Sequence, residues 1–291
     1  TGWSWLLCAA LSPAFAAAPT LDADIDALEK TDVSDADFRR LLARIDAEGT
    51  PKLKARAYAL QCQRNVGADP EAVRKVAEDG IAIARAAKAQ AELGGLLLCR
   101  GYIEESAENG ARALADYSEA IAVSDKAEMP GDAAQARALR GELLHNQGRY
   151  AEGLRDMQAA YRHHTAVGNE AQQSYTLNAI ANFYADPRVG QYDKALQYYR
   201  QVLGGHIARR RRGDAATTRY NIASTMERKG EYREALAEFR ATLSGYEAEG
   251  DTGMIADTRR AMAAMLLRMK RPAEALPLAE QALAGAQNAD D

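Results

Sequence analysis

Apolar residues recur along the chain at the spacing of one face of a helix. Leu177, Ile180, Ala181 and Tyr184 stand at positions i, i+3, i+4 and i+7, which puts all four side chains on one side of a helix. Similar sets recur in residues 195–203, 222–226 and 235–243. Each set predicts a helix that buries one face, and the predicted helices come in pairs.

A short motif separates the two helices of each pair. The sequences GRYAEGL, GQYDKAL, GEYREAL and KRPAEAL begin at residues 148, 190, 230 and 270, at offsets of 42, 40 and 40. Matches at a nearly constant spacing indicate an internal repeat. Small residues stand where paired helices must approach closely, at Gly141, Ala181, Ala223 and Ala263.

A second marker runs in phase with the first. It consists of the dipeptides Gly131-Asp132, Gly168-Asn169, Gly213-Asp214 and Gly250-Asp251. We expect each glycine to end a helix in the left-handed conformation and each Asp or Asn to cap the next helix. Every unit is therefore predicted to contain a helix, a turn, a second helix and a linker.

These features resemble the tetratricopeptide repeat. The family pattern of a small residue followed by an aromatic one is matched by Ala181 with Tyr184 and by Ala195 with Tyr199, and it recurs at Ala235 with Phe239. The resemblance implies an all-α fold, a right-handed superhelical solenoid of antiparallel helix pairs. The spacing exceeds the usual repeat of about 34 residues and resembles a bacterial subtype with longer helices.

The repeat pattern divides the chain into four parts. We expect a signal peptide with an incomplete basic region in residues 1–16, a helical pair in 17–50, two degenerate repeats in 51–130 and four clearer repeats in 131–291, the chain ending at a repeat linker. Asp69-Pro70 should start a second helix. Pro277 should bend or shorten the last helix.

The first residues carry the features of an export signal. A short apolar run ending at Leu11 precedes Ala14-Phe15-Ala16, a typical cleavage site before Ala17. The run is too short to span a bilayer. A core helix at the N-terminus is the alternative. Export would place the protein in the periplasm or another extracytoplasmic compartment and would remove Trp3 and Trp5.

Composition and motifs narrow the possible activities. The 291 residues include 37 Lys and Arg against 41 Asp and Glu, and a net charge of -4 gives no support for bulk nucleic-acid binding. The sequence contains neither phosphate-binding glycine loops, nor a nucleophile elbow, nor a helical zinc motif. We therefore predict no enzyme, no cofactor and no metal site in these residues, and no membrane span, with a possible membrane anchor beyond them.

Two clusters leave alternatives open. His163-His164 could bind a metal, although a solvated helix end is the simpler interpretation. The run Arg209–Arg212 could be a solvated linker at a helix end, or could meet an anionic partner or a phospholipid head group.

The resemblance also implies a ligand groove lined by the first helix of each repeat. The family's groove positions fall on polar residues, whose amides and hydroxyls can hydrogen-bond an extended peptide backbone; an ordinary polar surface is the alternative. The groove candidates are Gln135, Glu142, His145, Asn146, Tyr175, Asn178, Asn182, Tyr220, Asn221, Ser224, Glu227, Arg228 and Arg260. Asp186, Asp257 and Arg268 occupy further groove positions.

Two cysteines remain after the predicted cleavage. Cys62 and Cys99 would lie on the first helices of neighbouring repeats, which pack side by side, so an oxidising compartment would allow a disulfide. Two buried free thiols are the alternative.

We expect an extracytoplasmic binding module that holds a peptide, a protein segment or a small ligand. The resemblance extends to periplasmic sensor regions of bacterial diguanylate cyclases, and less closely to those of histidine kinases. Cyclase activity would lie outside these residues, because the G-G-D-E-F motif is absent. A free-standing periplasmic adaptor is the other alternative.

Overall fold

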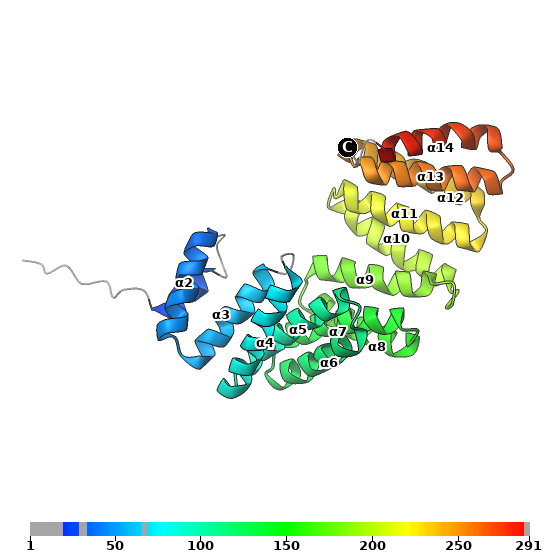
Figure 1. Ribbon diagram of the computed structural model, residues 1–291. Helices are drawn as coiled ribbons and strands as arrows, with labels where there is room; N and C mark the ends of the chain where they lie inside the picture. Colours follow the sequence, from blue (N-terminus) through cyan, green and yellow to red (C-terminus); the bar gives the residue numbers. More distant parts are fainter. Residues whose placement is uncertain (1–19, 29–33, 66–68, 288–291) are drawn as a thin grey trace, which may run out of the picture. The chain divides into compact units, whose positions relative to one another are not determined.

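Helices make up the secondary structure of the described residues. A computed structural model describes residues 20–28, 34–65 and 69–287, and every element within these ranges is an α-helix (Figure 1). The predicted signal peptide lies outside the described residues. None of the helices in the described ranges is both long enough and apolar enough to cross a membrane.

The helices follow one another with short connections. They are α1 (Leu21–Leu28), α2 (Asp35–Glu48), α3 (Pro51–Arg64), α4 (Pro70–Ala87), α5 (Gln90–Ser106), α6 (Gly110–Lys126), α7 (Pro130–Asn146), α8 (Tyr150–Ala166), α9 (Glu170–Ala185), α10 (Tyr192–Ala208), α11 (Arg212–Lys229), α12 (Tyr232–Glu249), α13 (Thr252–Arg268) and α14 (Pro272–Gln287). The chain forms two compact units that divide within α5, one up to Cys99 and the other from Arg100 onward.

The first unit has a small core of its own. Ile25 of α1 packs with Leu41 and Ile45 of α2 and with Leu53 of α3, so the pair predicted in residues 17–50 corresponds to α1 and α2. The predicted start of α4 is confirmed, because Asp69 caps the helix through the backbone N–H of Glu71 and Pro70 is its first residue.

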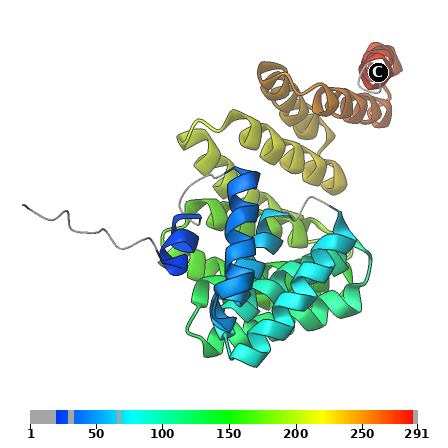
Figure 2. The same ribbon diagram turned by 60° about the vertical axis from the view of Figure 1, so that its left-hand side comes forward.

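The second unit is a stack of helix pairs. From α6 to α14 each helix packs against the next in the chain, and α7 also contacts α9. Figures 1 and 2 show consecutive helices from α9 to α14 running antiparallel and side by side. The predicted all-α arrangement of antiparallel pairs is confirmed.

One continuous core runs from α8 to α14. The predicted apolar face of α9, with Ile180, Ala181 and Tyr184, is buried, and so are Leu196 and Tyr199 of α10 and Phe239 of α12. Burying a large side chain of this kind contributes about 1.5–3 kcal/mol relative to exposure. The spacing of apolar residues therefore predicted both the helices and their buried faces correctly.

The turns between helices use left-handed residues. The prediction for the linkers is confirmed where Gly168 and Gly250 have φ of 69° and 74°, and where Asn169 and Asp251 cap α9 and α13. It is wrong for the other two dipeptides.

At those two linkers the turn falls earlier in the chain. Gly131 and Gly213 lie inside the first turns of α7 and α11, and the left-handed residues are Glu128 and Arg210, with φ of 56° and 57°. A non-glycine residue can take this conformation at a cost that the packed helices on both sides outweigh. Glycine alone is therefore an incomplete marker of helix ends in this chain.

Two glycines allow a close approach of the backbones of α7 and α8. A Cβ atom on Gly153 would lie 2.6 Å from the carbonyl oxygen of Gly141, and one on Gly141 would lie 2.9 Å from the carbonyl oxygen of Gly153. Both distances are too short for a carbon atom, so only glycine at these two positions allows this packing. Gly153 occupies the place that Ala195, Ala235 and Ala275 occupy in later pairs.

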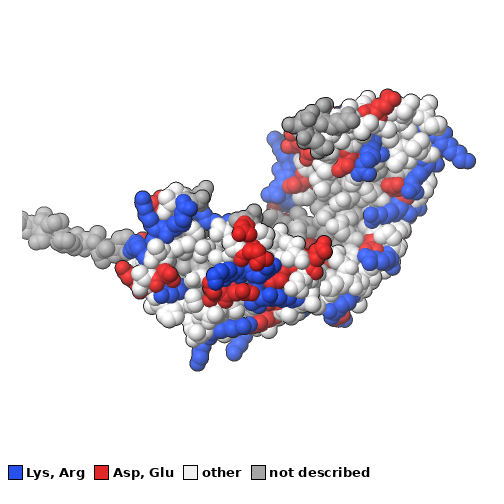
Figure 3. All heavy atoms as spheres, viewed as in Figure 1, with Lys and Arg blue, Asp and Glu red and all other residues white. Residues whose placement is uncertain are grey.

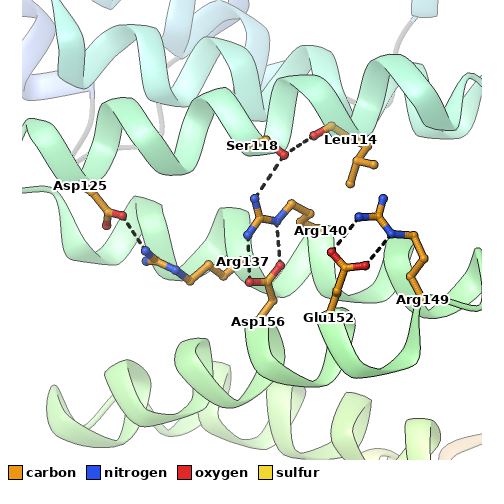
Figure 4. A network of polar contacts seen from close by, with 8 residues as sticks. All are labelled: Leu114, Ser118, Asp125, Arg137, Arg140, Arg149, Glu152 and Asp156. Carbon is orange, nitrogen blue, oxygen red and sulfur yellow. Dashed lines mark hydrogen bonds and ion pairs between the residues drawn. The ribbon is translucent and has the colours of Figure 1, made fainter.

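Ion pairs cross between the helices of a pair. Figure 4 shows Arg140 of α7 donating two hydrogen bonds to Asp156 of α8, at 2.7 and 2.9 Å, and one to Ser118 of α6. Arg100 of α5 makes the same two-pronged contact with Asp116 of α6, at 2.8 and 2.6 Å. These fork-shaped pairs fix the register of one helix against its neighbour.

Pro277 does not interrupt the last helix. It lies inside α14, which nevertheless runs for 16 residues, against 17 in α10. The expected shortening is therefore wrong. The missing N–H removes one helical hydrogen bond near the start of α14, where most of the helix remains to hold the conformation.

Candidate ligand-binding groove

Three adjoining hollows form a groove along the first helices of the pairs. The first, of about 310 Å³, lies between α7 and α9, and the second, of about 320 Å³, lies between α9 and α11. They share Asn182. The third, of about 280 Å³, lies between the N-terminal halves of α9 and α11 and shares Tyr175 and Asn178 with the first.

The first hollow is lined by a carboxylate and its tyrosine partner. The hydroxyl of Tyr175 on α9 lies close enough to the Glu142 carboxylate on α7 for the two groups to interact. Burial raises the pKa of Glu142, and the negative charge of Glu105 on α5 raises it further, against the opposing effects of Tyr175 and His145. The pKa of Tyr175 is raised as well, mainly by burial and then by the charge of Glu142. This end of the groove therefore concentrates negative charge.

A charged cluster anchors the turn after α9. His145 Nε2 lies 3.0 Å from Asp186 Oδ2, and Arg188 donates to both oxygens of the same carboxylate at 3.0 and 2.7 Å. The Arg188 guanidinium beside Asp186 holds the pKa of that carboxyl well below its usual range. The ring of Tyr150 packs edge-on against His145 and lies under Arg188. The longer turn, which the sequence indicates as an insertion, is thus tied to α7.

The second hollow is bounded by residues that already bond across elements. Arg228 of α11 donates to the backbone oxygen of Ala185 at 3.0 Å, and the buried Tyr199 hydroxyl donates to Asn182. By contrast, the side chains of Asn221 and Ser224 form no hydrogen bond within the described part of the chain, and neither does Asn178 in the first hollow. These amides and this hydroxyl are available to a ligand.

The third hollow has a mixed lining. Ser174, Thr217 and Thr218 contribute hydroxyls, and Arg211 lies 3.7 Å from the carboxylate of Asp214. His206 is buried, and burial lowers the pKa of its imidazole. Its Nδ1 is 3.8 Å from Asp214, too far for a hydrogen bond.

Most of the predicted groove residues come together in these hollows. Lining the first or second hollow are Glu142, His145, Asn146, Tyr175, Asn178, Asn182, Tyr220, Asn221, Ser224 and Arg228. Asp186 lines the second hollow. Whether these residues contact a ligand stays a prediction.

Other predicted residues lie elsewhere. Gln135 is exposed on α7, outside all three hollows. Glu227 pairs with Arg268 at 3.3 Å, and Arg260 pairs with Asp257 at 2.9 Å within α13, so these four side chains bind one another rather than line the hollows.

Tyr102 and Glu105 are candidates that the sequence analysis missed. They occupy in α5 the places that Glu142 and His145 occupy in α7, counted from the helix starts at Gln90 and Pro130. Carrying the groove positions into this weaker repeat would have identified them. The groove positions do not include Tyr199, because they belong to the first helix of each pair and Tyr199 belongs to the second helix α10. Tyr199 nevertheless lines the second hollow.

Members of the histidine pair and of the arginine run have contacts within the fold. His164 is buried, so the expectation of a solvated helix end is wrong for it, and burial lowers its pKa. No group of three or more His, Cys, Asp or Glu side chains that could hold a metal occurs in the described ranges. Of the arginine run, Arg209 binds Glu170 at 3.0 Å and Ser174 at 2.9 Å.

The two cysteines of the described residues are joined. Cys62 on α3 and Cys99 on α5 form a disulfide with their Cα atoms 6.3 Å apart, an ordinary separation for such a bond. Cys62 is fully buried and Cys99 nearly so. The redox state of the pair in the cell stays a prediction.

Sequence comparison identifies repeats in the C-terminal part. Residues 176–214 and 214–288 each match a profile described as tetratricopeptide repeat. This part of the chain therefore carries tetratricopeptide repeats. A search of curated protein sequences finds no match.

Solved structures with the same architecture extend the likeness over most of the chain. A signal-transduction ATPase with a tetratricopeptide repeat sensor from Pyrococcus horikoshii gives a TM-score of 0.72 at 13% identity, covering 91% of this chain and 41% of that one. A Rap protein complexed with Competence and Sporulation Factor gives 0.63 at 14% identity, covering 92% and 73%.

The apo quorum sensor NprR from B. thuringiensis gives a TM-score of 0.67 at 15% identity, covering 92% of this chain and 74% of that one. NprR is also solved in complex with its cognate peptide NprX. At these identities the likeness shows the fold, an all-α solenoid of the tetratricopeptide type.

Proposed function

We propose that this chain is a non-catalytic binding module whose groove along α7, α9 and α11 holds an extended peptide or protein segment. The observation that carries the proposal is the set of unsatisfied polar groups at the groove, Asn178, Asn221 and Ser224, between hollows that adjoin one another. Amide side chains offer a donor and an acceptor together, which suits the alternating N–H and C=O groups of an extended backbone. The complex of NprR with its cognate peptide NprX supports this choice of ligand.

The internal hydrogen bonds of the groove residues determine which substitutions can test ligand binding without disturbing the fold. Asn182 and Arg228 are exposed, yet they bond to Tyr199 and to the Ala185 carbonyl, so their loss would also disturb the fold. The better test is the pair Asn178→Ala and Ser224→Ala, since neither side chain has an internal hydrogen bond to lose. The matched control is Gln201→Ala with Ser244→Ala, at exposed positions of the second helices α10 and α12.

The probe is a set of heptapeptides selected from a random phage-displayed library on the unaltered protein. The groove variant should weaken their binding by about tenfold or more in fluorescence anisotropy, since two ligand hydrogen bonds are lost. Its melting temperature and that of the control should stay near the unaltered value. Equal binding by the groove variant and the control would contradict the proposal.

We further propose that the module is exported and forms the sensor region of a longer signalling protein, with a diguanylate cyclase as the leading candidate for its output domain. The apolar run before Ala14-Phe15-Ala16 supports export. Exposed leucines at the last helix pair, Leu276 at 61% and Leu283 at 62%, support a further helix packed against α14. A free-standing periplasmic adaptor and a histidine kinase sensor are the alternatives.

Two observations test this second proposal. Mass spectrometry of the protein recovered from the periplasm of a producing bacterium should find an N-terminus near Ala17, and Trp3 in the recovered protein would contradict export. The gene sequence downstream of the codon for Asp291 should encode more helix, a membrane span and a G-G-D-E-F domain. An immediate stop codon would favour the adaptor instead.

A further inference from the structure

The groove carries unbalanced charge at its α5–α7 end. Glu105 accepts a hydrogen bond from the Tyr117 hydroxyl at 2.8 Å, and Glu142 interacts with the Tyr175 hydroxyl. Tyrosine hydroxyls are neutral donors, so they satisfy the carboxylate oxygens without cancelling the charge. Within the described ranges neither carboxylate forms an ion pair with Lys, Arg or His.

The other acidic groups along the groove are already neutralised. Asp186 is held by Arg188 and His145, and Glu227 is held by Arg268. Asp257 and Asp214 likewise have arginine partners, at 2.9 and 3.7 Å. A cation entering the groove therefore gains most by approaching Glu105 and Glu142.

The two carboxylates are near enough to affect each other. The charge of Glu105 is one of the causes that raise the pKa of Glu142, and both charges raise the pKa of Tyr117 and Tyr175. Repulsion between like charges in a partly buried place costs free energy that a bound cation would relieve. This end of the groove therefore favours a positive ligand group.

Aromatic rings stand beside the carboxylates. Tyr102 of α5 and Tyr175 of α9 are each 46% exposed, although they are large side chains on a packed scaffold. An ammonium or guanidinium group gains from contact with such rings as well as from the carboxylates. A divalent metal fits less well, because fewer than three His, Cys, Asp or Glu side chains converge anywhere in the described ranges.

We infer that the first hollow and the end of α5 beside it form a specificity pocket for a basic residue of the bound peptide. Glu142 and Tyr175 line the hollow, and Glu105 and the exposed Tyr102 of α5 lie next to them. The inference rests on the proposed peptide-binding function. It names the partner as a peptide with a lysine or arginine side chain at one position, whose backbone runs from this pocket toward Asn182 and the second hollow.

The experiment compares two selections from the random heptapeptide library. One uses the unaltered protein and the other uses the double variant Glu105→Gln with Glu142→Gln, which keeps the size and the tyrosine hydrogen bonds. Glu234→Gln, an exposed glutamate on α12, is the matched control. The unaltered protein and the control should enrich lysine or arginine at one position, and the double variant should lose that enrichment.

A second measurement changes the peptide and can be made on the unaltered protein. The strongest selected peptide is synthesised with its basic residue replaced by citrulline for arginine, or by acetyl-lysine for lysine, which removes the charge at nearly constant size. Its affinity for the unaltered protein should fall by about tenfold or more, as expected for a charge-assisted contact. If the double variant is folded, the same replacement should leave its affinity nearly unchanged.

The outcomes separate the inference from the function on which it rests. Selected peptides that depend on Asn178 and Ser224 but show no basic preference would overturn the pocket and leave the groove standing. So would a neutral analogue that binds the unaltered protein as tightly as its parent. A selection that yields no binder, or binders indifferent to the Asn178 and Ser224 substitutions, would overturn the groove itself.

Discussion

Single residues decide how closely the helices of this chain can pack. At Gly153 the backbone of α8 comes so near to Gly141 of α7 that one added carbon atom would meet a carbonyl oxygen at 2.6 Å. Later pairs place alanine at the position of Gly153. The approach of α7 and α8 therefore depends on glycine at both positions.

We predict that Gly153→Ala destabilises the protein by about 1–3 kcal/mol, because a backbone oxygen cannot move aside as a side chain can. The measurement is urea denaturation followed by circular dichroism. The matched control is Gly204→Ala in α10, where an added Cβ would meet no atom within 4 Å. That change should stabilise the protein by about 0.5–1 kcal/mol, since alanine is the better helix former. Equal effects at both positions would contradict the packing argument.

The charge state of Asp186 is a second property set at the residue scale. The folded state holds its pKa below the unfolded value of about 3.9, chiefly through Arg188 and also through His145. The ionised carboxylate therefore stabilises the fold above about pH 4, and this contribution is lost as the pH falls further.

Asp186→Asn should consequently lower the free energy of unfolding at pH 7. The difference between the unaltered protein and the variant should shrink as the pH is lowered from about 4 toward 2, because the protonated aspartic acid loses its charge as well. Denaturant titrations of both proteins across this range measure the difference directly. A gap that stays constant down to pH 2 would show that the turn is held by other contacts.

At the scale of helices, the sequence predicted elements better than their ends or their polar contacts. The spacing of apolar residues predicted the buried faces of α9 to α12, because apolar residues with a period near 3.6 all lie on one side of a helix. The turns at Glu128 and Arg210 were missed, since a charged residue in the left-handed conformation leaves no local signal. The pairing of Glu142 with Tyr175, and of Asp186 with His145, was also hidden, because each joins residues from different repeats that only the fold brings together.

Ion pairs stabilise the fold to different extents according to their burial. Arg140 of α7 and Asp156 of α8 are largely covered, with side-chain exposures of 24% and 13%, whereas Arg149 and Glu152, which pair at the start of α8, are 44% and 45% exposed (Figure 4). Water and salt weaken the second pair far more than the first.

Asp156→Ala should therefore cost about 2–3 kcal/mol in the free energy of unfolding, because it leaves Arg140 partly buried without its carboxylate. Glu152→Ala, which removes a carboxylate from the same helix, should leave the melting temperature unchanged within error. Calorimetry of the two variants at low and at high salt tests the contrast. A larger loss for Glu152→Ala would reverse the assignment.

At the scale of the whole molecule, charges of both signs are mixed over the visible surface (Figure 3), whereas the disulfide lies in the first unit. Figure 3 shows basic and acidic side chains intermixed over the face in view, without a large field of one sign. Covalent linkage is confined to the first unit, where the disulfide closes a loop with a sequence separation of 37 residues between α3 and α5.

Reduction of this disulfide should lower the stability of the first unit by about 4 kcal/mol, the chain-entropy value for such a loop. Thiol titration of the mature protein, denatured without reductant, should find no free thiol from Cys62 or Cys99. The variant Cys62→Ala with Cys99→Ala should melt at the same temperature with and without reductant. Two titratable thiols in the denatured, unreduced protein would establish the buried dithiol form instead.

The disulfide also determines how the molecule would respond to tension. A stack of helix pairs held only by packing extends under load as successive pairs peel away, and each released residue adds up to about 3.5 Å of length. The residues between Cys62 and Cys99 cannot be extended while the disulfide is intact. With a sequence separation of 37, the bond therefore prevents about 130 Å of extension. The chain between the two cysteines on α3 and α5 therefore cannot lengthen under load, whereas every later helix pair can unfold and extend.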